Sequence, residues 1–121
     1  MIIYTSRTGN VEYIVKKLGL PDKKLSNNMV VDYPYILFTY TDKIGETPDV
    51  VKEFLTNNYK YLKGVICSGN SNFGVNNFCK PADDISKQFR VPILKKIELR
   101  GFDEDYKQVK MKYNEIMKGC N

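Results

Sequence analysis

Short apolar runs alternate along the chain with segments in which apolar residues recur at helical spacing. The first run, Met1 to Tyr4, has the length and composition of a buried parallel strand. From Val11 the apolar positions recur at i, i+3, i+4 and i+7, which predicts a helix. The polar residues 5–10 lie between the two, so they form a turn that leads from a strand directly into a helix N-terminus.

The same alternation continues to the other end of the chain. Aromatic and branched residues predict strands at 35–40 and at 65–67, the second opened by Gly64, and a last strand is expected from 91 to 101. Helices are expected from Pro48, with Thr47 as N-cap, and then around 78–89 and 106–116. Residues 23–31 are ambiguous, since Leu25 and Met29–Val31 are only possible strand pieces and the stretch is too short and polar for a full crossover helix.

This pattern predicts a single α/β domain over residues 1–121. Strands and helices that alternate through short loops form a parallel sheet covered on both faces, and five strands in the order 2-1-3-4-5 fit best. With 121 residues and 42% apolar content the chain has room for one sizeable core. A mean hydropathy of -0.42 excludes a membrane span, and the strand that starts at Met1 leaves no signal sequence, so a cytoplasmic location is expected.

Composition narrows the chemistry. The chain has no histidine, which excludes Ser-His-Asp and Cys-His catalysis and most zinc sites, so any chemistry is expected to come from a cofactor. Its three cysteines form no C-x-x-C pair and no disulfide framework. The net charge is +5, and the Lys and Arg residues are scattered along the chain, as is typical of a solvated surface. This distribution does not resemble a nucleic-acid site, but it is compatible with an acidic protein partner.

Three polar loops follow the first, third and fourth strands, at the edge where such sheets bind ligands. They are Thr5–Asn10, Thr41–Glu46 and Ser68–Gly74. The first offers backbone N–H groups, a helix dipole, hydroxyl and amide donors, and a glycine, which together suit a phosphate monoester. Helix capping alone is the simpler alternative, although one residue is enough for a cap.

The other two loops have the composition of a lining for a flat, polar ligand. Tyr40 and Phe73 are the aromatic residues placed to stack on it, and ordinary packing is the alternative for each. Gly45 can rotate its peptide at little cost, so its carbonyl or N–H group could follow the protonation of a ligand atom. The alternative is a plain turn glycine.

These residues carry a resemblance to a known family. The segment Thr5–Asn10 resembles the phosphate loop of flavodoxins, which bind flavin mononucleotide (FMN). The segment Ser68–Gly74 is similar to the Ser-Gly-Asn-x-Asn-aromatic-Gly motif of the NrdI family, the flavoprotein activators of class Ib ribonucleotide reductase. The likeness continues through Thr39-Tyr40-Thr41, Gly45, Pro48, Val91-Pro92 and Glu98-Leu99-x-Gly101, and the missing second crossover helix suits that compact family.

The resemblance implies a cofactor, a mechanism and a site. Bound FMN, reduced by an unidentified reductant, would pass electrons to dioxygen. The resulting oxidant would serve the manganese site of the partner subunit NrdF as that subunit forms its tyrosyl radical. The protein would act as an accessory activator rather than a turnover enzyme, with neither nucleic acid nor membrane as partner. Phosphate contacts would come from the first loop and ring contacts from the other two. The implied cofactor-binding residues are Thr5, Ser6, Arg7, Thr8, Gly9, Asn10, Tyr40, Thr41, Gly45, Ser68, Gly69, Asn70, Asn72, Phe73 and Gly74.

Two positions depart from the family pattern, and one alternative function stays open. Asp42-Lys43-Ile44 stands where some members have a glycine-richer loop, and Arg7 can either contact the anion or face solvent. A generic flavodoxin that shuttles single electrons is the alternative function, although such proteins are strongly acidic and this chain is basic. Two other functions are excluded. A phosphoacceptor domain needs acidic residues at the ends of the first and third strands, where this chain has Thr5-Ser6 and Tyr40-Thr41, and a low-molecular-weight phosphatase needs a C-x₅-R motif, which this chain does not have.

Overall fold

The computed structural model describes residues 1–120, in which five strands form one sheet. The strands are β1 (Ile2–Tyr4), β2 (Asp22–Lys24), β3 (Tyr35–Tyr40), β4 (Leu62–Gly69) and β5 (Ile93–Glu98). All neighbouring pairs are parallel, and the order is β2-β1-β3-β4-β5. The predicted topology is therefore confirmed.

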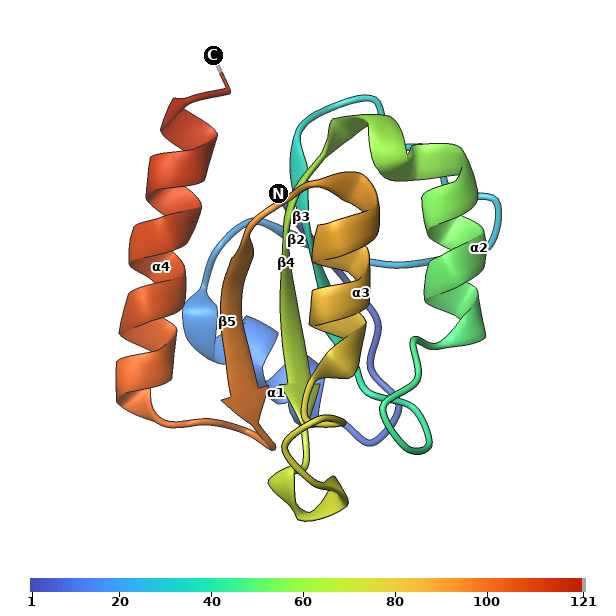
Figure 1. Cartoon of the computed structure of the whole chain (residues 1–121). Helices are drawn as coiled ribbons and strands as arrows, with labels where there is room; N and C mark the ends of the chain where they lie inside the picture. Colours follow the sequence, from blue (N-terminus) through green and yellow to red (C-terminus); the bar gives the residue numbers. More distant parts are fainter. Residues whose placement is uncertain (121) are drawn as a thin grey trace.

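Helices cover both faces of the sheet (Figure 1). Helices α1 (Asn10–Leu18) and α4 (Asp103–Lys118) pack on one face, and α2 (Asp49–Asn58) and α3 (Lys80–Phe89) pack on the other. Short 3₁₀ segments, η1 (Tyr59–Tyr61) and η2 (Ser71–Phe73), precede and follow β4. Successive side chains of β1 enter opposite cores, Ile2 beneath α1 and α4 and Ile3 beneath α2 and α3, as strand geometry requires.

The connection from β2 to β3 contains no helix in residues 25–34, as the sequence predicts. A buried side chain of α2, Asn58, holds this connection in place. Its Oδ1 accepts a hydrogen bond from Val31 N at 2.8 Å, and its Nδ2 donates to the carbonyls of Met29 at 2.9 Å and Phe54 at 3.0 Å. One amide side chain thus supplies the backbone partners that a helix or strand would otherwise provide.

Two predicted boundaries near β4 and α2 are wrong by one to three residues. Gly64 does not open β4 but lies inside it, next to a register shift against β3, where a β-carbon would be 2.6 Å from Cδ1 of Leu94. Thr47 is not the N-cap of α2; Pro48 takes that position with ψ of 141°, and the helix begins at Asp49. An extended ψ cannot belong to the first helical turn.

The last strand and the third helix are both shorter than the predicted ranges 91–101 and 78–89. Strand β5 ends at Glu98, because Leu99 has a positive φ of 53° that breaks the extended conformation. Helix α3 begins at Lys80 rather than at Phe78, because Cys79 is in the left-handed region with φ of 51°. Among the described residues, no helix is both long and apolar enough to cross a membrane.

Candidate functional site

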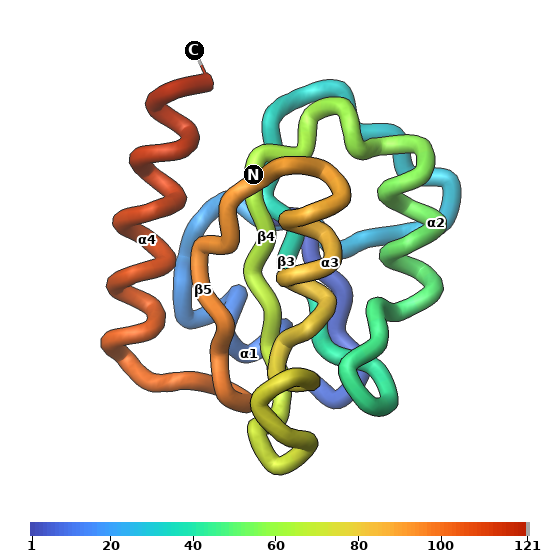
Figure 2. The backbone as a smooth tube through the Cα atoms, viewed as in Figure 1, coloured from blue at the N-terminus to red at the C-terminus, as the bar shows by residue number. Residues whose placement is uncertain are grey.

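A cavity of about 450 Å³ lies at the carboxyl end of the sheet, where the three polar loops meet. Figure 2 shows the chain segments that follow β3 and β4 turning back at this same end of the molecule. The cavity is lined by Ser6, Arg7, Thr8, Asn10, Val11, Tyr40, Thr41, Asp42, Lys43, Ile44, Gly45, Ser68, Gly69, Asn70, Phe73, Asn77 and Leu99. Most of the residues predicted for the site are thus brought together around one hollow.

Four predicted site residues do not line the cavity. Thr5 extends the sheet, donating its N–H to the carbonyl of Phe38 at 3.2 Å. Gly9 and Gly74 occupy backbone conformations with φ of 94° and 97°, which explains the glycines. Asn72 is exposed, and its N–H is bound by the Oδ1 of Asn70 at 2.9 Å. The structure therefore places these four residues next to the cavity in sequence but not among those that line it.

The first loop presents unpaired backbone donors. Within residues 1–120, no acceptor bonds the N–H groups of residues 6–11. These groups lie at the N-terminus of α1, where the helix dipole favours negative charge. Ser6 also serves the helix, because its Oγ accepts a hydrogen bond from Glu12 N at 3.3 Å. Capping therefore accounts for Ser6 but leaves the other donors of the turn available to an anion.

Arg7 turns toward the second loop instead of the first. Its guanidinium lies 4.0 Å from Oδ1 of Asp42 and 5.6 Å from the centre of the Tyr40 ring. The side chain is 59% exposed, so this ion pair is weak. Burial raises the pKa of Tyr40, the Asp42 carboxylate raises it further, and Arg7 opposes the shift. The Tyr40 hydroxyl accordingly stays protonated at neutral pH.

The second loop closes on itself as a small hairpin. Asp42 and Glu46 exchange backbone hydrogen bonds, with N to O distances of 2.8 and 2.9 Å. Lys43 and Gly45 inside it have positive φ values of 43° and 74°. Gly45 is buried, so the backbone itself forms this wall of the cavity.

Two hydroxyls predicted to contact the ligand are occupied by the frame of the site. Thr41 Oγ1 donates to the carbonyl of Ser68 at 3.0 Å, and Ser68 Oγ donates to the carbonyl of Leu99 at 2.6 Å. Together they join the carboxyl ends of β3, β4 and β5. Gly69 allows the close approach of Cys79, whose Sγ would lie 3.1 Å from a β-carbon at position 69. These three positions hold the strand ends in register beneath the cavity.

Several residues that line the cavity were not predicted from the sequence. Asn77 donates its Nδ2 to the carbonyl of Phe73 at 2.9 Å and so braces the third loop. Val11 and Leu99 add apolar surface to the lining. Leu99 was not expected at the site because the last strand was predicted to run through it to residue 101.

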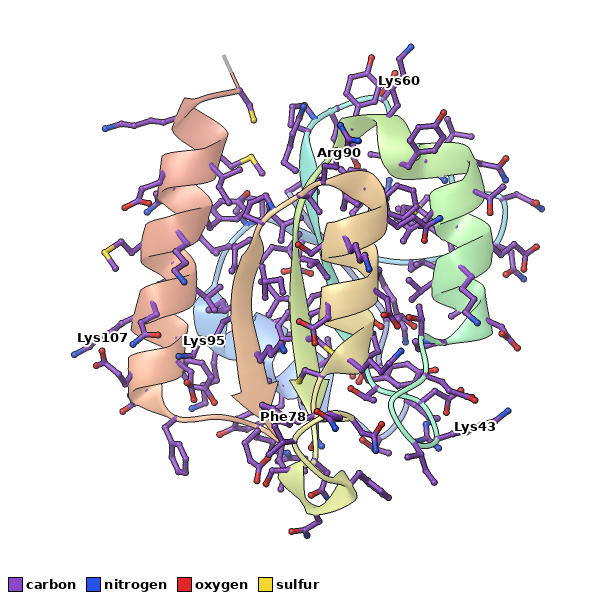
Figure 3. All side chains as sticks on the ribbon, viewed as in Figure 1. Lys43, Lys60, Phe78, Arg90, Lys95 and Lys107 are labelled. Carbon is purple, nitrogen blue, oxygen red and sulfur yellow. The ribbon has the colours of Figure 1, made fainter. Side chains whose placement is uncertain are left out.

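The mouth of the cavity combines cations with exposed apolar side chains. The lining contains the cations Arg7 and Lys43 and a single carboxylate, Asp42. Lys43 projects outward from the second loop, at the opposite end of the molecule from Lys60 and Arg90 (Figure 3). The loops at this end also expose large apolar residues, whose exposed fractions run from 45% to 93%: Leu99, Phe73, Ile44, Phe102 and Val75.

This sheet order, with polar loops after β1, β3 and β4 that meet at the carboxyl end of the sheet, defines a protein of the flavodoxin-like class. The family model described as NrdI flavodoxin-like matches residues 2–111. The chain therefore belongs to the NrdI flavodoxin-like family.

Relatives of known family support the same assignment. The chain is 45% identical over 105 residues to Protein NrdI of Bacillus licheniformis, a match covering 86% of this chain and 79% of that protein. It is 38% identical over 122 residues to Protein NrdI of Macrococcus caseolyticus, covering 96% and 90% of the two chains.

Solved structures support the fold. A short-chain flavodoxin associated with a PDU bacterial microcompartment superposes with a TM-score of 0.73 at 17% identity, covering 99% of this chain and 97% of that one. The flavodoxin of Fusobacterium nucleatum, bound to flavin mononucleotide in its structure, superposes with a TM-score of 0.58 at 17% identity, again covering 99% and 97%. At these identities the likeness concerns the fold alone.

Proposed function

We propose that the chain binds FMN in the cavity at the carboxyl end of the sheet. The phosphate would lie on the turn at residues 5–10, and the ring system would lie between the second and third loops. Membership of the NrdI family and the FMN-bound flavodoxin of Fusobacterium nucleatum support this cofactor.

The residues present fit such a group. A volume of about 450 Å³ falls in the range of ~300–1,000 Å³ that is usual for small-molecule sites. The unpaired N–H groups of residues 6–11 suit a phosphate. Tyr40 and Phe73 supply aromatic surface to the same cavity, and Gly45 and Gly69 also line it. No side chain is required as a general acid or base.

The proposed activity is that of the flavoprotein activator of class Ib ribonucleotide reductase. Bound FMN supplies electrons for the reduction of dioxygen, and the resulting oxidant serves the manganese site of the small subunit, NrdF. The chain's own residues hold the phosphate, orient the ring through the second and third loops, and present the cavity mouth to the partner. An unidentified reductant would supply the electrons.

The observation that favours the activator over a single-electron shuttle is the charge of the cavity lining. Arg7 and Lys43 outnumber Asp42, and the whole chain carries a net charge of +5. Negative charge beside a flavin resists the formation of its fully reduced anion, whereas positive charge does not. A basic lining therefore suits a protein that must hold a fully reduced flavin until dioxygen arrives.

The partner surface proposed here is the rim of the cavity. A short-lived oxidant is lost to solvent unless the flavin edge docks over the entrance of the partner's channel. Phe73 and Asn72 lie on the exposed third loop, Lys43 lines the cavity, and the exposed Lys80 is the first residue of α3. Aromatic residues suit the centre of such an interface, while lysines at its edge mainly affect the encounter rate.

The deciding experiment is the formation of tyrosyl radical in manganese-loaded NrdF. The FMN-loaded protein is reduced, mixed with the cognate NrdF and exposed to dioxygen, and the radical is measured by electron paramagnetic resonance. Radical is expected in this mixture but not with manganese and dioxygen alone. If no radical forms while the protein still passes single electrons to other acceptors, the shuttle function is the correct one.

A further inference from the structure

Arg100 lies beside the first loop although the two are far apart in the sequence. It belongs to the turn between β5 and α4, and its Nε donates a hydrogen bond to Oδ1 of Asn10 at 3.2 Å. Its guanidinium also lies over the Tyr13 ring, 4.6 Å from the ring centre. Arg100 thus contacts two residues of the first turns of α1, the helix whose N-terminus faces the cavity.

The turn that carries Arg100 is held at both sides. Ser68 Oγ donates to the carbonyl of Leu99 at 2.6 Å, and the hydroxyl of Tyr106 donates to the carbonyl of Arg100. Leu99 N donates in turn to the carbonyl of Gly69 at 2.8 Å. The backbone at position 100 is therefore fixed to the end of β4 and to α4, so the position of the guanidinium does not depend on a free loop.

The contact with Arg100 determines which way the Asn10 amide faces. A guanidinium has hydrogen-bond donors and no acceptor, so only the Oδ1 of Asn10 can pair with it. The Nδ2 group is then left on the other side of the amide, and no residue among 1–120 accepts a hydrogen bond from it. Asn10 lines the cavity, so its free donor is available to an anion on the turn. Arg7, the cation within the loop itself, points to Asp42 and Tyr40 instead.

We propose that Arg100 is a positioning residue of the phosphate site. It holds the Asn10 amide with Nδ2 directed to the phosphate of FMN, and it places positive charge at the N-terminus of α1. Without it, the amide is free to rotate and to present its oxygen to the anion. This role rests on the proposed binding of FMN, and the experiment below separates the two.

The experiment compares FMN with riboflavin, which lacks the phosphate. Dissociation constants of both ligands are measured by flavin fluorescence for the wild-type chain, Arg100→Gln and Lys17→Gln. Lys17 is the matched control, because its Nζ lies over the same Tyr13 ring at 5.5 Å but one turn further from the loop. Arg100→Gln is expected to reduce the preference for FMN over riboflavin about tenfold, and Lys17→Gln to change it less than about twofold. Riboflavin affinity should be unchanged in both.

A second comparison tests whether Arg100 acts through Asn10. If it does, Asn10→Ala and Arg100→Gln should not be additive, and the double variant should lose less preference for FMN than the two single losses combined. Full additivity would overturn the positioning role.

The remaining outcomes are also decisive. A wild-type chain that binds FMN no more tightly than riboflavin refutes the phosphate site itself, and with it the proposed function. A wild-type preference that Arg100→Gln leaves intact overturns only the role of Arg100. If Arg100→Gln weakens the binding of FMN and of riboflavin equally, Arg100 contributes to folding rather than to the phosphate site. If Lys17→Gln lowers the preference for FMN as much as Arg100→Gln does, the effect of Arg100 is one of general positive charge. Either result contradicts the proposal.

Discussion

Asn77 lies directly against Gly45: a β-carbon at position 45 would be 3.0 Å from Oδ1 and 3.2 Å from Cβ of Asn77. The same Asn77 side chain donates its Nδ2 to the carbonyl of Phe73 at 2.9 Å. One amide thus connects the second loop to the third, on the two sides of the proposed ring site. The absence of a side chain at position 45 allows this close contact between the two loops.

We predict that Gly45→Ala weakens FMN binding. The substitution meets a positive φ of 74° and the contact with Asn77, so both the loop and its neighbour must shift. Gly19→Ala is the matched control, because Gly19 has a similar φ of 65° with no atom within 4 Å of the added carbon. Each variant should lose roughly 1–2 kcal/mol of unfolding free energy from backbone strain.

The two variants should differ in their affinity for FMN. FMN fluorescence should report at least about a fivefold weaker complex for Gly45→Ala, while Gly19→Ala should stay within about twofold of the wild-type chain. Equal affinities for the two variants would mean that the contact with Asn77 has no bearing on the ligand site.

The fold was predictable to the extent that it depends on apolar pattern. β3 carries buried side chains at nearly every position, and its bounds agree with the predicted 35–40. β2 could not be located in this way, because Asp22–Lys24 is exposed along its whole length. Only backbone pairing with β1 makes this segment a strand, and backbone pairing leaves no mark on side-chain composition.

The lining of the cavity was predictable where one loop supplies several of its residues in sequence. The contacts of Arg100 with Asn10, and of Asn77 with Gly45, join residues that are far apart in the chain. The hydroxyls of Thr41 and Ser68 have the composition of ligand donors, yet they bond to carbonyls of neighbouring strand ends. Composition identifies available donors, whereas only the packed structure shows which of them are already used.

Asn58 provides a prediction about stability. Asn58→Ala removes the partner of Val31 N and of the carbonyls of Met29 and Phe54, so it should lower the unfolding free energy by ~1–3 kcal/mol. Asn57 is the matched control, because it is the neighbouring asparagine and is exposed. Asn57→Ala should change stability by less than about 0.5 kcal/mol in urea denaturation. Similar losses for the two variants would show that the buried hydrogen bonds contribute little.

The three cysteines should differ in reactivity. Cys67 and Cys79 are fully buried, and the contact with Cys67, followed by burial, raises the pKa of Cys79 well above its ordinary value. Burial closes both thiols to reagents, and the raised pKa of Cys79 also disfavours its reactive thiolate, so neither should react in the folded protein, whereas the partly exposed Cys120 should. Mass spectrometry after treatment with iodoacetamide should find label at Cys120 alone, and at all three positions in denaturant. Label at Cys79 in the native protein would contradict the buried arrangement, and Cys120→Ser provides the unlabelled control.

The last prediction concerns the encounter with NrdF. Lys43 projects from the rim of the cavity and is 3.7 Å from Glu46, an exposed pair that leaves most of its charge available to a partner. Lys43→Glu should slow association with NrdF severalfold at low salt and much less at high salt, because ions screen exposed charges. Lys60→Glu makes the same charge change at the opposite end of the molecule, as Figure 3 shows, and should leave the rate nearly unchanged. Stopped-flow measurement of the association rate at several salt concentrations tests both variants. If Lys60→Glu slows association as much as Lys43→Glu, net charge rather than the rim directs the encounter, and the partner surface proposed here is wrong.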